Sequence, residues 1–231
     1  MKAAYLTGNA IDLLQNGSEF FPALIAAIDA AEREFHLETY IFEDDATGRA
    51  VAGALCRAAR RGVAVRVLAD GFGAADFVAT LRPQLEAAGV QVLVYRPEIA
   101  RFRLRRHRLR RLHRKLAVAD GRSAFVGGIN IVDDIDAAHP APPRFDYAVR
   151  VEGPLLVPIH TTVRRLWTLV SWASFRRRLR LCGRRFARFS RRRSSRSPRR
   201  GRRHIFSGRR FRLPMHRRRL GPDLMQALHQ P

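Results

Sequence analysis

The arginines of this 231-residue chain are concentrated at its C-terminal end. From Ser171 onward there are 21 arginines and a single acidic residue, Asp223. Residues 1–170 hold the other 23 basic residues and 19 acidic ones, so they carry only +4 of the net charge of +24. An arginine-rich segment without a hydrophobic period cannot bury enough apolar surface to offset its ordering entropy. We therefore expect one folded domain over residues 1–172 and a disordered basic tail over residues 173–231.

Within the first 172 residues, apolar positions alternate between helical and strand-like spacing. Phe21, Leu24, Ile25 and Ile28 follow the i, i+3, i+4, i+7 spacing of an amphipathic helix, whereas residues 35–42 form a β-rich run. The same criteria predict helices at 51–62, 77–88 and 154–172 and strands at 63–69, 90–95 and 147–151. This alternation predicts an α/β fold with a mixed, largely parallel sheet flanked by helices on both faces.

Two further strands, expected at residues 112–120 and 124–130, carry chemically versatile side chains. His113 and Lys115 are two residues apart, so they point to the same face of an extended segment. A neutral imidazole can attack a phosphodiester while an ammonium group holds the non-bridging oxygens. The pair therefore predicts phosphoryl-transfer chemistry that requires no metal ion and no other cofactor.

Lysine is rare in this chain. Of the 44 basic residues, only Lys2 and Lys115 are lysines. A compact ammonium and a planar guanidinium are not interchangeable around a tetrahedral phosphate. We interpret Lys115 as chemically required, with compositional drift as the alternative.

The spacing H-x-K-x4-D, followed by G-G-x-N, resembles the HKD motif of the phospholipase D superfamily. The similarity extends from about Tyr5 to about Trp172 and is to bacterial cardiolipin synthases of the B type. Four further stretches carry it: residues 8–17, 37–42, 70–73 and 146–154. The resemblance implies a phospholipase D-like half-domain. It also implies transfer of a phosphatidyl group between two phosphatidylglycerols, with release of glycerol, through a phosphohistidine at His113.

The resemblance implies roles for the other polar residues of the motif region. Lys115 and Asn130 would bind phosphate oxygens. Asp146 would accept a hydrogen bond from the non-attacking nitrogen of His113 and so fix its tautomer. Asp120 belongs to the catalytic motif, although in this superfamily the motif aspartate often acts as a structural anchor.

A basic segment precedes the motif. Residues 101–111 contain seven arginines interleaved with Phe and Leu. Such a segment can lie on an anionic bilayer, with Arg103, Arg105, Arg106 and Arg108 on lipid phosphates. Nucleic-acid phosphates would satisfy it equally well, and a solvated loop is the third alternative. Its position before the motif favours substrate approach, and the resemblance favours phosphatidylglycerol at a membrane surface.

Glu38 and the two cysteines are the remaining candidates for special roles. Glu38 interrupts the apolar run 35–42, so it is either buried and paired near the cleft or exposed on an edge strand. Cys56 and Cys182 lack the spacing of a disulfide framework or a zinc site.

The sequence shows no signal for insertion into a membrane. The N-terminus lacks a basic start followed by an apolar run, and no apolar stretch reaches the roughly 18 residues of a spanning helix. We therefore expect a peripheral protein on the cytoplasmic face of the bacterial inner membrane.

The chain departs from its family because it carries one motif. Cardiolipin synthases of this type carry two HKD motifs, with the active site between two halves, and no second H-x-K occurs here. We therefore expect activity to need a second motif-bearing half or a homodimer, and we hypothesise that residues after about Leu181 are a frameshifted remnant. The alternatives are a single-motif nuclease or phosphodiesterase acting as a homodimer, and an inactive cationic remnant that binds membranes or nucleic acid.

Overall fold

The computed structural model describes residues 6–96, 111–133 and 145–194, with side chains up to Leu179. The residues up to Gly183 form one compact unit, and a second unit begins at Arg184. None of the described helices combines the length and the apolar character that crossing a bilayer requires.

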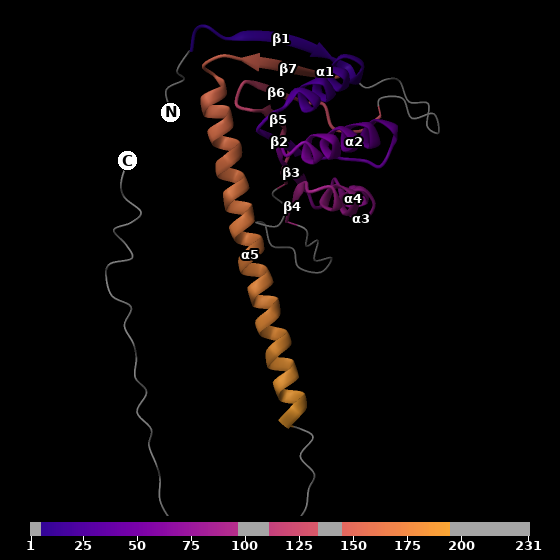
Figure 1. Ribbon diagram of the computed structural model, residues 1–231, viewed down its shortest axis with the longest axis vertical. Coiled ribbons are helices and arrows are strands. Elements are labelled where there is room, and N and C mark those ends of the chain that lie inside the picture. Colours follow the sequence, from indigo (N-terminus) through magenta and orange to yellow (C-terminus); the bar gives the residue numbers. More distant parts are fainter. Residues whose placement is uncertain (1–5, 97–110, 134–144, 195–231) are drawn as a thin grey trace, which may run out of the picture. The chain divides into compact units, whose positions relative to one another are not determined.

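Among the described residues, seven strands form one sheet (Figure 1). In sequence order they are β1 (Ala10–Gln15), β2 (Glu34–Thr39), β3 (Ala64–Asp70), β4 (Gln91–Tyr95), β5 (Lys115–Ala119), β6 (Ser123–Gly127) and β7 (Tyr147–Glu152). In space their order is β1-β7-β6-β5-β2-β3-β4. The motif strand β5 therefore occupies the centre of the sheet, with β2 beside it.

The sheet is mixed, as predicted, but its parallel part is smaller than expected. β2, β3 and β4 run parallel, whereas the other four pairings of the described strands are antiparallel. The hairpin between β5 and β6 explains part of this difference. Asp120 and Gly121 both have positive φ, 53° and 65°, as a type I′ turn requires, and Asp-Gly favours that turn. Apolar runs predict that strands are buried, but they do not give the direction of each strand.

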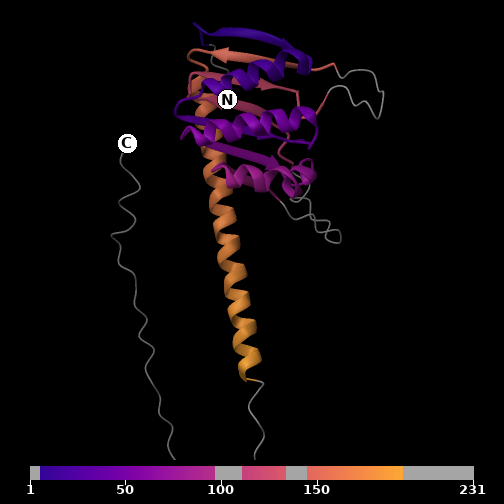
Figure 2. The same ribbon diagram turned by 45° about the vertical axis from the view of Figure 1, so that its right-hand side comes forward.

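Helices cover both faces of the sheet, as predicted (Figures 1 and 2). On one face lie α1 (Asn16–Ala30), α2 (Ala46–Arg60), α3 (Ala75–Ala79) and α4 (Leu81–Ala87), and on the other lies α5 (Leu156–Ser194). The main core fills the space under α1, α2 and α4, and it includes Leu24, Ile28, Phe35, Val51, Leu55, Val67, Leu85 and Phe125. The helix predicted at 77–88 is divided at Thr80, and Pro83 lies in the first turn of α4, where its missing N–H is not needed.

α5 packs on the sheet through its first half and then continues further than predicted. Leu156 and Val163 contact Val118 and Ala124, and Val170 is its last core residue. Residues 173–194, expected to be disordered, are helical, whereas 195–231 lie outside the described residues. Arginine, leucine and alanine are strong helix formers, and a packed helix already supplies the nucleus that an isolated segment lacks.

β1 is a strand that the sequence analysis did not identify. It lies at the edge of the sheet and pairs with β7. Ile11 and Leu13 are 59% and 64% exposed, so the strand has no buried face that would produce a clear alternation. Its pairing depends on β7, which is more than 130 residues away in the sequence.

We predict that ending the chain after Trp172 removes helical signal without loosening the fold. The deleted part of α5 lies beyond Val170, and Phe175 is 53% exposed, so few core contacts are lost. Far-ultraviolet circular dichroism should show less helix per molecule, and the midpoint of thermal unfolding should stay within a few degrees. A chain ended after Ser194 serves as the control and should keep the helical signal. Equal helical signals per molecule in the two shortened chains would contradict the extended α5.

Candidate active site

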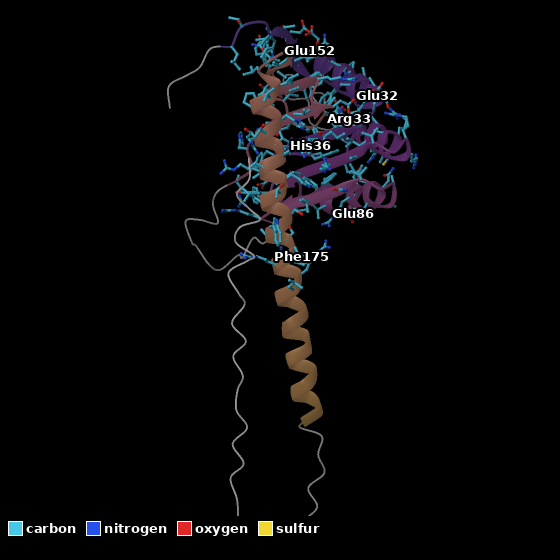
Figure 3. The ribbon with its side chains drawn as sticks, turned by 60° about the vertical axis from the view of Figure 1, so that its left-hand side comes forward. Glu32, Arg33, His36, Glu86, Glu152 and Phe175 are labelled. Atoms are coloured by element: carbon cyan, nitrogen blue, oxygen red, sulfur yellow. The ribbon has the colours of Figure 1, made fainter. Side chains whose placement is uncertain are left out.

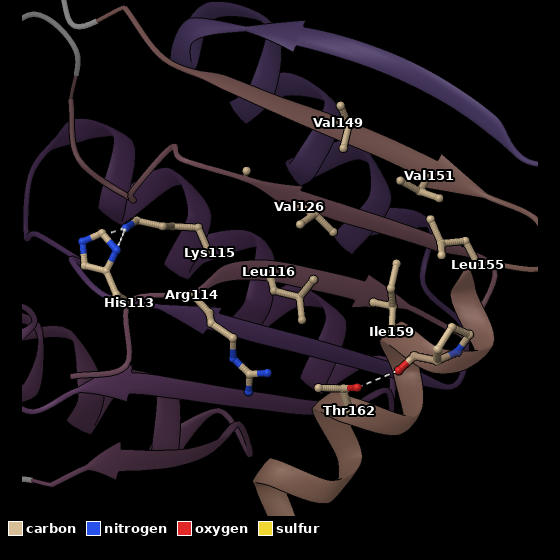
Figure 4. Close-up of a pocket in the computed structure, with 12 residues that line it drawn as sticks. His113, Arg114, Lys115, Leu116, Val126, Val149, Val151, Leu155, Ile159 and Thr162 are labelled. Atoms are coloured by element: carbon tan, nitrogen blue, oxygen red, sulfur yellow. Dashed lines mark hydrogen bonds between the residues drawn. The ribbon is translucent and has the colours of Figure 1, made fainter. Parts of the chain in front are cut away.

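The candidate nucleophile and its lysine lie at the start of β5. Lys115 opens the strand and is 8% exposed, whereas His113 precedes the strand and is exposed to solvent. The Nζ atom of Lys115 lies 3.3 Å from Nδ1 and 3.4 Å from Nε2 of His113 (Figure 4). The two side chains predicted to share a face are therefore in contact. A phosphate bound by this ammonium would also lie against the imidazole.

Tyr40 is a residue of this site that sequence reasoning missed. Its ring centre is 4.9 Å from that of His113 and 5.5 Å from the Nζ atom of Lys115. The negative face of an aromatic ring attracts an ammonium group. Tyr40 directly follows β2 and lies within the family-like stretch 37–42, but no local pattern connects it with position 113. The Tyr40 ring thus packs against both His113 and Lys115.

Asp146 lies beside Lys115 and not in a hydrogen bond with His113. Burial lowers the pKa of Lys115, and the Asp146 carboxylate opposes this shift because it favours the charged ammonium. Oδ1 of Asp146 accepts a hydrogen bond from the amide of Tyr147 at 2.8 Å. No hydrogen bond between Asp146 and His113 is found in the described part of the chain, so the predicted tautomer-fixing bond is absent there. The carboxylate is held by its own strand and acts on the lysine.

The position of Asp146 is fixed from two sides. The amide of Asn16 donates to the Asp146 carbonyl at 2.9 Å, and Oδ1 of Asn16 accepts from the Asp146 amide at 3.1 Å. A Cβ atom at Gly128 would overlap the Asp146 carboxylate, and one at Gly127 would lie 2.5 Å from Cα of Ala148. The two glycines of the motif therefore make room for the carboxylate and for β7.

Asn130 is tied to the segment that carries Tyr40. Its Oδ1 atom accepts a hydrogen bond from the Ile41 amide at 3.1 Å. Ile131 extends this contact, because its amide donates to the Ile41 carbonyl at 3.1 Å. With the oxygen of the amide group occupied, the Nδ2 atom of Asn130 supplies N–H donors. This orientation is compatible with its predicted role toward phosphate oxygens.

Asp120 lies away from His113 and Lys115, which agrees with its alternative role as a structural anchor and not with its place in the catalytic group. It follows the last residue of β5, roughly 16 Å along the strand from Lys115 at about 3.3 Å per residue. Its carboxylate accepts three backbone hydrogen bonds, from Glu32 at 2.9 Å, Arg33 at 2.9 Å and Glu34 at 2.8 Å. Burial alone would raise the pKa of Asp120, but the three amides outweigh it and hold that pKa below 3.8. Asp120 therefore anchors the start of β2.

Glu38 is buried and paired near the cleft, the first of its two predicted alternatives. It is 2% exposed, and its Oε2 atom lies 2.7 Å from Nη2 of Arg114. Apart from this ion pair, neither carboxylate oxygen has a well-aligned hydrogen-bond donor in the described structure. Burial raises the pKa of Glu38 to about 7, although the Arg114 charge works in the opposite direction. Glu38 therefore changes its protonation state near neutral pH.

A groove with a volume of about 600 Å³ begins at His113 and Lys115 (Figure 4). It follows the face of the sheet on which α5 lies. Beyond Arg114 its lining is almost entirely apolar, with side chains from Leu116, Val126, Val149, Val151, Leu155, Pro158 and Ile159. This lining suits an apolar group attached to the phosphate better than a second charged group.

Away from this groove, Glu34, His36 and His160 have potential metal-binding atoms within 4.8 Å of one another. His36 lies between the sheet and α5, where its ring also contacts Trp167 (Figure 3). Burial lowers the pKa of His36 to about 4. However, Nη1 of Arg66 is 2.9 Å from Glu34 Oε2 and 3.1 Å from His36 Nε2, so a guanidinium already supplies the positive charge. We interpret the cluster as a polar contact that joins β2 and β3 to α5.

Most of the basic segment at residues 101–111, predicted to approach the substrate, lies outside the described residues. Arg103, Arg105, Arg106 and Arg108 lie outside the described residues. Arg111 is described, and its guanidinium lies 4.8 Å from the ring centre of Phe72.

We predict that Asp120→Ala lowers the free energy of unfolding by about 2–3 kcal/mol, because three amides lose a charged acceptor. Asp120→Asn keeps an Oδ1 acceptor for Arg33 and Glu34 and should lose about half as much. The Asp120 contribution is present above its ordinary pKa of 3.8 and fades as the pH falls through its lower folded value. Urea unfolding measures both variants. Equal stability of wild type and Asp120→Ala at neutral pH would contradict the anchor.

We also predict a pH-dependent stability difference between the wild type and Glu38→Gln. The folded chain keeps the Glu38 proton up to about pH 7, whereas the unfolded chain releases it near 4.5. The wild type should therefore lose roughly 3 kcal/mol relative to Glu38→Gln as the pH rises across this window. His36 titrates in both proteins, so its contribution cancels. Glu32→Gln, at an exposed position, should run parallel to wild type, and a parallel curve for Glu38→Gln would contradict the prediction.

The sequence of this chain is similar to those of known cardiolipin synthases. Residues 24–134 match the family model described as "Cardiolipin synthase, PLD-like domain". Cardiolipin synthase B of Escherichia coli K12 is 38% identical over 177 residues, which are 72% of this chain and 43% of that protein. Cardiolipin synthase B of Salmonella typhi is 42% identical over 159 residues, 69% of this chain and 38% of that protein. The chain thus spans less than half the length of these relatives.

Solved structures agree on the fold. Nuc from Salmonella typhimurium, a phospholipase D family member, has a TM-score of 0.52 at 17% identity, over 70% of this chain and 95% of Nuc. NucT from Helicobacter pylori has a TM-score of 0.55 at 16% identity, over 70% of this chain and 97% of NucT. By its motif and its relatives, the chain therefore belongs to the family of phospholipase D-like domains of the cardiolipin synthase type, which the family model matches over residues 24–134.

Proposed function

We propose that this chain supplies one half of a phosphatidyltransferase site that joins two phosphatidylglycerols into cardiolipin and releases glycerol. The observation that carries this proposal is the position of the His113–Lys115 pair at one end of an apolar groove. A phosphodiester held at Lys115 can lay its lipid portion along Val126, Val149 and Val151. The names of the relatives support the same substrate class.

In the first chemical step, a ring nitrogen of His113 attacks the phosphorus atom of the donor lipid. An N–P bond forms, the P–O bond to the headgroup glycerol breaks, and the leaving alkoxide takes a proton from a general acid. In the second step, a hydroxyl of the acceptor lipid attacks the same phosphorus atom and gives its proton to the group that served as general acid, now a base, while the N–P bond breaks and releases His113. The lipid phosphate has then moved from glycerol to the acceptor.

Three further residues of the candidate site assist this chemistry. Lys115 holds the non-bridging oxygens, whose negative charge is greatest in the transition state. Asp146 favours the charged form of that lysine in spite of its burial. Asn130, with its oxygen bound to Ile41, offers its amide nitrogen as a further donor.

The general acid must come from a second half. One histidine cannot be the covalent nucleophile and protonate the leaving alkoxide in the same step. The edge strand β1 offers a surface for that half, because Ile11 and Leu13 are 59% and 64% exposed. They lie opposite Val151 and Val149 at the margin of the groove but do not line it, and exposed apolar side chains of this kind indicate an interaction surface. We propose that a second motif-bearing half or a second copy of this chain covers it, at the periphery of a membrane rich in phosphatidylglycerol.

A phosphodiesterase or nuclease that acts as a homodimer is the second candidate. The fold covers 95% and 97% of the two solved chains described above, so a domain of this extent exists as a separate chain. The apolar lining of the groove argues against a nucleotide there, because nucleic acid presents a phosphate at every residue of its backbone.

We predict that a monomeric sample has no transferase activity and that any specific activity rises with protein concentration. Loss of the general acid alone typically costs about 10²- to 10⁴-fold. Cardiolipin formation on phosphatidylglycerol vesicles and nicking of plasmid DNA are measured side by side against oligomeric state, with His113→Ala as control.

Each result of this paired assay has a different consequence. Cardiolipin formation by the assembled form, abolished in His113→Ala, supports the proposal. Nicking without cardiolipin formation would favour the nuclease, and the absence of both in every oligomeric state would favour the inert remnant. A constant specific activity in a demonstrably monomeric sample would overturn the need for a second half.

A further inference from the structure

A second cavity lies on the other side of His113 and Arg114. Its volume is about 380 Å³, and its polar lining consists of Tyr95, Arg111, Thr162 and Arg165 together with those two residues. His113, Arg114 and Thr162 line both this cavity and the apolar groove. The two spaces therefore meet at the candidate nucleophile.

The second cavity differs from the groove in its charge. Three guanidinium groups line it, and none of its described lining residues is acidic. Glu38 neutralises part of the Arg114 charge through their 2.7 Å contact. Arg111 contacts the ring of Phe72, and no ion pair is found for Arg111 or Arg165 within the described parts of the chain. Two arginines thus contribute positive charge that no carboxylate in the described structure compensates.

This arrangement matches the geometry that the proposed transfer reaction requires. In the second step, the acceptor lipid brings a hydroxyl to the phosphorus atom held at His113. The acceptor carries its own phosphate at the opposite end of the same three-carbon glycerol headgroup. An anion-binding cavity next to His113 would hold that phosphate while the hydroxyl reaches the reaction centre. Arginine suits this task because its planar fork binds phosphate oxygens in pairs.

We propose that the cavity between Arg111, Arg114 and Arg165 binds the phosphate of the acceptor phospholipid. This inference rests on the proposed transferase function and adds a second phosphate site to it. Leu166 and Leu169 line the same cavity, so the adjoining apolar part of the acceptor has somewhere to lie. The donor phosphate occupies Lys115, and the acceptor phosphate occupies the arginines.

The test measures binding and does not depend on turnover. Isothermal titration calorimetry compares the full chain with Arg165→Gln and Arg164→Gln, all carrying His113→Ala to prevent chemistry. The probe is short-chain phosphatidylglycerol below its micelle concentration. Arg164 neighbours Arg165 on α5 and is exposed, but it does not line the cavity, so it is a matched control for charge. The arginine-rich tail is the same in all three proteins, so any contribution of the tail to lipid binding cancels in the comparison.

Arg165→Gln should weaken phosphatidylglycerol binding about tenfold relative to Arg164→Gln, because one charge-assisted contact with phosphate is lost. A difference smaller than twofold between these variants would overturn the proposal. Inorganic phosphate and short-chain diacylglycerol are the two further probes. Weak competition by phosphate and none by diacylglycerol is expected, whereas phosphate binding as tight as that of the lipid, and equally sensitive to Arg165→Gln, would assign the cavity to free phosphate and overturn the lipid site.

Failure of the proposed function is distinguishable from failure of this inference. If the transferase assay is negative while lipid binding still depends on Arg165, the acceptor-phosphate site stands and the catalytic proposal fails. If transfer occurs while the binding is insensitive to Arg165, the reaction stands and the second phosphate site is refuted.

Discussion

The antiparallel pairing of β2 with β5 joins the two halves of the sheet, and the Asp120 carboxylate secures it. Three amides at the start of β2 converge on that carboxylate at the end of β5. This contact fixes the register in which Glu38 lies opposite Leu116. At the other end of the same pairing, the register brings Tyr40 to His113. The motif aspartate therefore determines the geometry of the candidate active site from the far end of a strand.

Burial affects the charges of two side chains at the site, Lys115 and Glu38. The ammonium of Lys115 lies under the surface, where burial lowers its pKa and the carboxylate of Asp146 favours the charged form. On the neighbouring strand, the buried Glu38 pairs with the partly exposed Arg114. The site thus presents the Lys115 ammonium toward His113. Such an arrangement favours a phosphate group over a neutral ligand.

Sequence alone could predict the contacts that are local or periodic. His113 and Lys115 touch because residues two apart in an extended segment share a face, and most helices and strands followed from apolar spacing. The contacts of Tyr40 and Asp146 could not be predicted, because both depend on strand order across the sheet. β1 shows no alternation of apolar and polar residues because most of the strand is exposed. The continuation of α5 was missed because an arginine-rich composition shows that a segment has no apolar face to bury, but it does not show whether a packed helix continues into that segment. For Asp120 the motif left a catalytic role and a structural anchor open, because a motif specifies identity and spacing but not the distance between side chains, and its three backbone contacts agree with the anchor.

The edge position of β1 has a consequence for the chemistry of the distant lysine. Asn16, the first residue after β1, holds the backbone of Asp146 through two hydrogen bonds, and Asp146 lies beside Lys115. Segments with few buried apolar contacts open most readily in local fluctuations, and most of β1 is exposed. Fraying of β1 would therefore release Asp146 and remove the support for the lysine charge. The proton affinity of the Lys115 ammonium is in this way coupled to the local stability of β1.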